Sequence, residues 1–251
     1  MVWTLIRRGL VVGVIAGLLA GLFAFVFGEP LVQDAIDIEE AASAHASLAS
    51  LPLAHISDWA VGRPEQRGGL LLATALYGAA AGGLFAIAFA VLRGRGAQRS
   101  DWELATRLAG VIFVALVLVP WIKYPPNPPA VGDPGTIGDR TAYYVILLVG
   151  AALAMLAAAR VVWSLRPEAP PWVRPLAGAG TFIAVAGGLA LALPGFQEIP
   201  ADFPAPLIWE FRLSSLGTQA VLWASLGIGY GIAMWRAAAS KASAAIVREA
   251  A

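Results

Sequence analysis

Acidic side chains and both histidines of the chain are concentrated in one polar segment, residues 28–68. Carboxylate and imidazole groups are common ligands of divalent metal ions. On a continuous helix, however, Asp34 and His45 would lie about 16 Å apart along the axis, too far for one ion. The helix alone therefore predicts a stripe of carboxylates. A metal site would also need Glu29, His55 or ligands from loops folded over the helix.

A second set of polar residues lies in a proline-rich loop, residues 121–141. Its five prolines fix φ and remove backbone donors, and its glycines permit turns that other residues resist. The loop is either a rigid turn between two helices, capped by Asp139 or Thr136, or the outer lip of a substrate site. Its candidate lip residues are Lys123, Asn127, Asp133, Asp139 and Arg140.

A second proline-rich loop, residues 194–206, resembles the first in composition. It contains Asp202 and leads into a helix whose first turns carry Glu210 and Arg212. That helix extends to about residue 236, which is longer than a bilayer core requires. Its first turns are therefore expected to stand above the membrane, at the height of the first loop.

The composition is that of a helical membrane protein. The chain of 251 residues is 59% hydrophobic and 13% charged, with a mean hydropathy of +0.74. The absence of cysteine excludes disulfides, thiolate metal sites and a cysteine nucleophile. The net charge of +1 gives no bulk attraction to nucleic acid.

Apolar runs predict an all-α protein that forms one membrane domain over residues 1–251, with about six membrane spans. The expected spans are residues 9–27, 69–92, 104–121, 141–163, 176–193 and 207–236.

Glycines at every fourth position of the first span, residues 13, 17 and 21, predict close packing against a neighbouring helix.

The outer segment, residues 28–68, is expected to contain an acidic helix over residues 30–49 with Pro30 in its first turn. The face of that helix expected to pack on the bundle carries Leu31, Ala35, Ile38 and Ala42. The residues around 62–64 are expected to form a loop.

The charges predict that both termini are cytoplasmic. The N-terminus, the 93–107 turn, the 160–174 turn and the C-terminus together hold 12 Lys/Arg and 4 Asp/Glu, against 5 and 12 on the other side. Every unusual segment then falls on the outer face. The spans carry no ionisable residue at mid-depth, unlike those of most self-sufficient ion-coupled carriers.

Three stretches resemble the CbtA family of predicted cobalt transporter subunits. They are FGEPLV at 27–32, followed by the acidic helix; KYPPNPPAVGDPGTIGDRTAYY at 123–144; and QEIPADFPAPLIWEFRLSSLGTQAVLWASLG at 197–227. The resemblance implies a multi-pass subunit of a cobalt uptake system in the bacterial plasma membrane, linked to cobalamin synthesis. It also implies a small one-span partner with a histidine-rich terminus, CbtB. Many members have several histidines in the first outer loop, whereas this chain has two.

If the chain is a cation permease subunit, cobalt is its substrate, no cofactor is permanently bound, and the ion first meets the acidic outer face. The predicted outer-mouth ligands are Glu29, Asp133 and Glu210, with His45 and His55 as further candidates. Arg140 and Arg212 are expected to be structural counter-ions. Glu29 could instead only form an ion pair that fixes the first helix to the last.

Two other functions remain open. The chain could be an accessory or assembly subunit that docks a partner through its outer loops and transports nothing. A membrane enzyme has little support, because the sequence has no paired-histidine motif at metal-ligand spacing, no nucleophile elbow and no phosphate-binding glycine loop.

Overall fold

The described residues form an all-α structure, as the sequence predicts. A computed structural model describes residues 2–47, 62–94, 100–129 and 131–249, and no strand occurs among them. These residues form two compact units, Met1–Val111 with Leu213–Ala251, and Ile112–Arg212. Each unit is described by itself.

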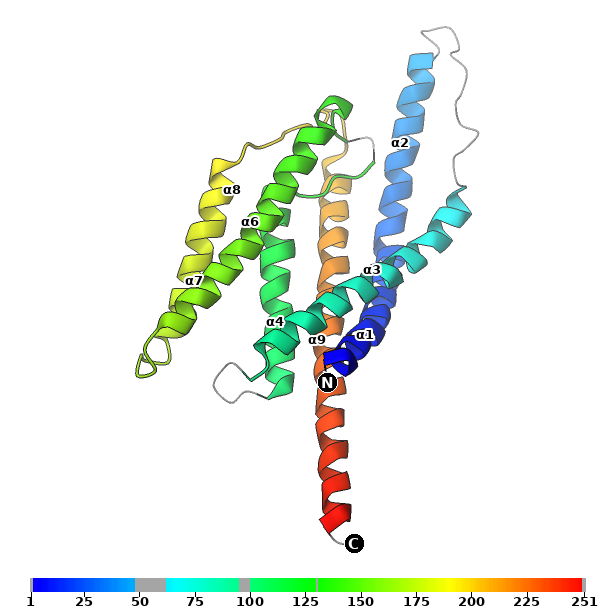
Figure 1. The fold of residues 1–251 in the computed structure, drawn as a ribbon. Helices are drawn as coiled ribbons and strands as arrows, with labels where there is room; N and C mark the ends of the chain where they lie inside the picture. The colour runs from blue at the N-terminus through cyan, green and yellow to red at the C-terminus, as the bar shows by residue number, and fades with distance from the viewer. Residues whose placement is uncertain (1, 48–61, 95–99, 130, 250–251) are drawn as a thin grey trace. The chain divides into compact units, whose positions relative to one another are not determined.

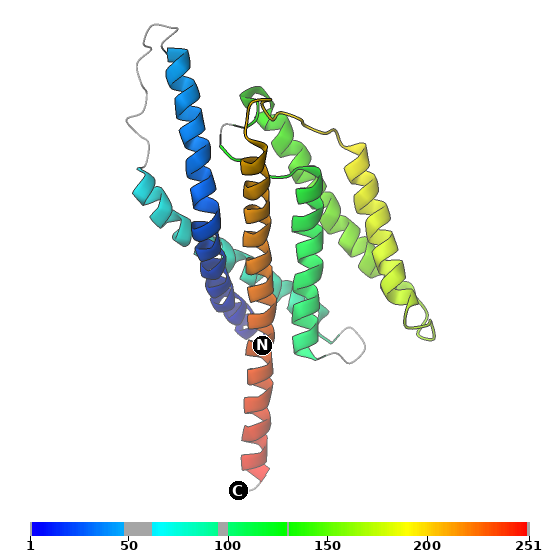
Figure 2. The same cartoon turned by 180° about the vertical axis from the view of Figure 1, so that it is seen from behind.

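The first unit contains α1 (Val2–Phe23), α2 (Glu29–Ser47), α3 (Arg63–Leu92), most of α4 (Asp101–Phe113) and most of α9 (Ala205–Glu249). Figures 1 and 2 both show α1 lying against α3. The backbones of these two helices are in contact. A Cβ atom added at Gly13 would overlap the carbonyl of Gly78, and one added at Gly17 would overlap that of Thr74. The glycine spacing therefore predicted this packing correctly.

Tyr230 of α9 lies at the centre of the first unit's apolar core and is completely buried. Its ring packs edge-on against Phe85 and Phe89 of α3, with centroids 5.4 and 5.0 Å away. Its hydroxyl donates to the Leu5 carbonyl at 3.3 Å. The buried hydroxyl therefore has an acceptor, and α1, α3 and α9 meet at this side chain.

The helix that contains the first predicted span does not end at residue 27, because the chain continues from α1 into α2 through a π-helical segment, Ala24–Gly28. Pro30 has no N–H, and in a regular helix its ring would collide with the carbonyl four residues earlier. The wider π turn just before the proline relieves that conflict. The same arrangement recurs in the segment Val114–Leu118, which precedes Pro120 in α5 (Val119–Lys123).

The expectation of a loop around residues 62–64 was wrong from Arg63 onwards, because α3 begins there. Gly62 is extended, and Pro64 occupies one of the first two helical positions, where a missing N–H has no consequence.

The inward face predicted for α2 is confirmed in part. Ala35 is fully buried, Leu31 and Ile38 are half-buried, and Ala42 is exposed. The neighbouring acids of the helix are exposed, namely Asp34, Asp37, Glu39 and Glu40.

The second unit contains α5, α6 (Ile137–Ser164), α7 (Val173–Phe182), α8 (Gly188–Ala192) and the first turns of α9. α6 packs against α7, and the buried Leu147, Ala151 and Ala154 mark its inner face. A π-helical segment, Ile183–Gly187, joins α7 to α8.

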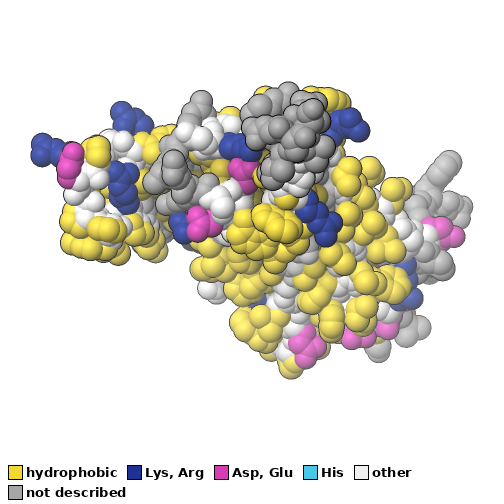
Figure 3. Space-filling model, turned by 90° about the horizontal axis from the view of Figure 1, so that it is seen from below, with side chains coloured by type: hydrophobic (Ala, Val, Ile, Leu, Met, Phe, Trp, Pro, Cys, Tyr) yellow, Lys and Arg dark blue, Asp and Glu magenta, His cyan; other side chains and the backbone are white. Residues whose placement is uncertain are grey.

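Five helical stretches of the described chain are long and apolar enough to cross a membrane. They are Val2–Ala42, Arg67–Leu92, Asp101–Lys123, Pro134–Ser164 and Val173–Ala192, and they contain or closely match the first five predicted spans. The sixth predicted span lies within α9, which is continuous but is not one of these five. Large apolar side chains are exposed on these stretches, up to 89% for Leu191. Figure 3 shows apolar side chains over much of the surface seen from below.

Candidate functional site

The two proline-rich loops meet in the second unit. At the end of α5, the Lys123 ammonium donates to the Leu193 carbonyl at 2.7 Å, and the Tyr124 hydroxyl donates to the Pro194 carbonyl at 2.8 Å. Burial, reinforced by nearby Tyr143, raises the pKa of Tyr124, so this hydroxyl stays protonated and able to donate. These bonds fix the start of the first loop to the start of the second.

Arg212, in the first turns of α9, holds the middle of the first loop. Its Nη2 donates to Asn127 Oδ1 at 2.8 Å, and its Nε donates to the Pro126 carbonyl at 3.3 Å. The Arg212 carbonyl in turn accepts from Trp121 Nε1 at 3.1 Å. Prolines have no N–H to pair with one another, so side-chain donors from the helices fix this part of the loop instead.

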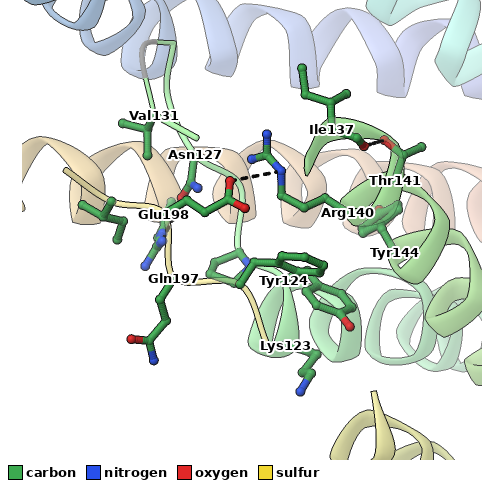
Figure 4. A pocket seen from close by; sticks show the side chains of 14 residues that line it. Lys123, Tyr124, Asn127, Val131, Ile137, Arg140, Thr141, Tyr144, Gln197 and Glu198 are labelled. Carbon is green, nitrogen blue, oxygen red and sulfur yellow. Dashed lines mark hydrogen bonds and ion pairs between the residues drawn. The ribbon is translucent and has the colours of Figure 1, made fainter. Parts of the chain in front are cut away.

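Glu198 of the second loop joins the far end of the first. Its carboxylate accepts from Thr136 Oγ1 at 2.6 Å and from the Asp133 backbone N–H at 2.9 Å. Arg140 Nε lies 3.3 Å from the same carboxylate, and Figure 4 shows the two side chains pointing toward one another. The Glu198 carboxylate therefore connects the second loop to the turn at Asp133–Thr136 and to Arg140 in the first turns of α6.

The turn itself is shaped by Asp133 and Gly132. The Asp133 carboxylate accepts from the Gly135 N–H at 2.7 Å and caps the short 3₁₀ turn Pro134–Thr136. Of the two expected caps, Thr136 occupies the N-cap position of α6 without a capping hydrogen bond from its side chain, and Asp139 lies in the first turn of that helix. Gly132 has φ +124°, and a Cβ added there would overlap the Arg140 guanidinium. Glycine is needed here because the backbone is left-handed and the arginine lies directly against it.

The loops line a half-open cavity of about 760 Å³. Its charged lining consists of Lys123, Arg140, Arg212 and the single carboxylate of Glu198. The rest of the lining is Tyr124, Pro125, Asn127, Val131, Ile137, Thr141, Tyr144, Phe196, Gln197 and Ile199 (Figure 4). Four predicted lip residues, Lys123, Asn127, Arg140 and Arg212, thus lie around one cavity.

The predicted metal ligands are not brought together in the part of the chain that the structure describes. Asp133 and Glu210 are exposed and do not line the cavity, and the Asp133 carboxylate is occupied as a cap. Asp139 and Asp202 are also exposed. No group of three His, Asp or Glu residues that could hold a metal occurs among the described residues.

The two histidines and Glu29 belong to the first unit or lie outside the described residues. His45 is in α2, but its side chain lies outside the described residues, as does the whole of His55. Glu29 is 12% exposed, and its Oε1 lies 2.9 Å from Arg67 Nε of α3. Among the described residues, this ion pair links the start of α2 to α3.

Glu198 is not among the site residues predicted from the sequence. Glu198 lies within residues 197–227, one of the three stretches that resemble the CbtA family. Its neighbours Gln197 and Ile199 also line the cavity. The available signal was a carboxylate with the apolar Phe196 and Ile199 close to it in a proline-rich loop, because a partly enclosed carboxylate needs donors.

Replacing Glu198 with glutamine should lower the thermal unfolding temperature at pH 7. Hydrogen bonds from Thr136 and the Asp133 amide, and then the Arg140 charge, hold the pKa of Glu198 below its ordinary value. A depressed folded-state pKa contributes stability above the unfolded value of about 4.3, and that contribution is lost as the pH falls through the lower folded value. The difference between wild type and Glu198→Gln should therefore shrink below about pH 4.

The matched control for that measurement is Glu210→Gln, the same chemical change at an exposed position. Thermal unfolding of the detergent-purified proteins at several pH values is the readout. A Glu198→Gln protein as stable as wild type at pH 7 would show that the carboxylate does not hold the loops together.

The fold and the cavity together define a multi-pass, all-α membrane protein whose two proline-rich loops enclose a polar cavity. Membership of a particular family follows from comparison of the whole chain. A family model described as "Probable cobalt transporter subunit (CbtA)" matches residues 2–235, so the chain belongs to the CbtA family. No curated protein and no solved structure matches it significantly.

Proposed function

We propose that this chain is the integral membrane subunit of a cobalt uptake system linked to cobalamin synthesis. The observation that carries the proposal is the match to the CbtA family over nearly the whole chain. The apolar helices support a role within the bilayer. Cobalt is then a transported substrate, with no resident cofactor and no enzymatic reaction.

The proposed working unit contains a second protein, a small one-span subunit with a histidine-rich terminus, like CbtB. The family is described as a subunit, which supports a partner. In the proposed orientation all of 1–251 is one membrane domain in the plasma membrane with both termini cytoplasmic, because 12 of the 17 Lys/Arg then lie inside.

The second candidate function is an accessory subunit that docks a partner through its outer loops without moving the ion itself. Two observations favour it. The described residues contain no three-ligand group for a metal, and the cavity between the loops has three cations and one carboxylate in its lining. Such a lining repels a bare divalent cation.

Uptake of radioactive cobalt should require both proteins. Cells that lack their own cobalt importer would express the chain alone, the one-span partner alone, or both. The transport proposal expects cobalt accumulation severalfold above background only in cells that express both proteins. Equal accumulation with the partner alone would contradict it.

The proposed orientation is tested by thiol labelling. Asp37→Cys should react with an impermeant thiol reagent in intact spheroplasts, whereas labelling only after permeabilisation would reverse the proposed orientation.

A further inference from the structure

The cavity between the proline-rich loops is positively charged overall. Three cationic side chains line its approximately 760 Å³, and Glu198 is the one carboxylate among the residues that line it. An excess of positive charge around a partly enclosed space attracts anions, and its effect is stronger than in open water because the walls lower the local dielectric.

The hydrogen bonds at the cavity fix these cations in place without neutralising two of them. Lys123 donates to a backbone carbonyl, and Arg212 donates to a carbonyl and to an amide oxygen, all of which are uncharged acceptors. Within the described residues, Arg140 is the lining cation that has an ion pair, with Glu198. Lysine has three N–H donors and arginine has five, so Lys123 and Arg212 keep donor capacity for a ligand.

The wall of the cavity also offers aromatic surface. Tyr124 and Phe196 lie with their ring centroids 6.1 Å apart, and Tyr144 completes this side of the lining. A ligand with an anionic group and an organic body would therefore find both charge and apolar contact.

The two loops that line the cavity join the ends of candidate membrane helices. One candidate span ends at Lys123, the next begins at Pro134, and a third ends at Ala192, next to the second loop.

We propose that this cavity binds a phosphate-bearing organic anion, with Arg212 as the cation that contacts the phosphate. A phosphate monoester or diester carries one to two negative charges, which the excess of cations over carboxylates in the lining attracts. The phosphate belongs either to an anionic phospholipid or to a water-soluble phosphate ester. The proposal does not depend on cobalt transport.

Binding is tested on the intact chain purified in an uncharged detergent. Glycerol 3-phosphate, with glycerol as its control, probes the soluble source by thermal shift. Phosphatidylglycerol, with diacylglycerol as its control, probes the lipid source by native mass spectrometry. Binding of phosphatidylglycerol alone supports a lipid site, and binding of glycerol 3-phosphate supports a site for soluble esters.

The variant that separates charge from folding is Ile137→Glu. Ile137 lines the cavity but is 56% exposed, so a polar residue there is tolerated, while a new carboxylate opposes the bound phosphate. Its affinity for the bound probe should fall about tenfold. The matched control Ile137→Gln should bind nearly as wild type, as should Arg166→Gln, which removes an exposed cation of the same unit away from the cavity lining. Absence of binding by both probes, or unchanged affinity in Ile137→Glu, would overturn the proposal.

Discussion

Replacing Gly13 with leucine should separate α1 from α3 and destabilise the whole first unit. An added Cβ would overlap the Gly78 carbonyl, and the leucine side chain has no space beyond it. Membrane helices associate largely through close van der Waals packing, so this contact cannot be replaced by a hydrophobic gain elsewhere. The free energy of unfolding should fall by about 1–3 kcal/mol, the usual cost of overpacking, and by more where the helices part.

The matched control is Gly110→Leu in α4, because a Cβ at Gly110 meets nothing within 4 Å and the residue is exposed on an apolar helix. The two variants add the same side chain, but only the leucine at position 13 meets the backbone of a neighbouring helix. Thermal unfolding in detergent gives the stability of each protein.

The separation of the helices is measured by cross-linking. The chain has no cysteine, so the pair Leu10→Cys and Gly83→Cys reports on α1 and α3 without background. A Cβ added at Gly83 would lie 3.2 Å from Leu10 Cδ2, which places the two positions in contact. Efficient cross-linking that persists after Gly13→Leu would show that the helices accommodate the side chain.

The membrane helices and their closest packing could be predicted because both signals are local in the sequence. Long apolar runs mark spans, and glycines at every fourth position mark a face bare of side chains. The continuity of α1 and α2 could not be predicted in the same way. Pro30 normally marks the first turn of a new helix, and a preceding π turn has no sequence signature comparable to a cap or a proline.

Part of the cavity lining could also be predicted from the sequence, but the role of Glu198 as the carboxylate that accepts hydrogen bonds from the first loop could not. Stiff backbone and polar composition singled out Lys123, Asn127 and Arg140 as lip residues. Glu198 bonds to groups more than 60 positions away in the chain. Spacing along the chain carries no information about such a contact, since it depends on how the two loops fold against each other.

Replacing Glu29 with glutamine should reduce cobalt uptake about tenfold or more if the carboxylate binds the ion, since even residues that only support a metal ligand cost that much when changed. This expectation rests on the proposed transport function. Glu29 is 12% exposed at the junction of the π segment and α2, where a charge is costly unless it is paired or binds an ion. Asp37→Asn, a change at an exposed acid of the same helix, should leave uptake unchanged.

Arg67 distinguishes a ligand from a purely structural ion pair. Because its Nε lies 2.9 Å from the Glu29 carboxylate, Arg67→Gln removes the same ion pair while leaving the carboxylate in place. A structural role predicts that Glu29→Gln and Arg67→Gln lower the thermal unfolding temperature and the uptake together. A ligand role predicts that uptake is lost only with Glu29→Gln and survives Arg67→Gln, because that variant keeps the Glu29 carboxylate. Both variants are compared at matched expression, with stability measured on the purified proteins. Equal uptake in Glu29→Gln and wild type would exclude Glu29 as an essential ligand, and parallel losses in the two variants would assign it to the fold.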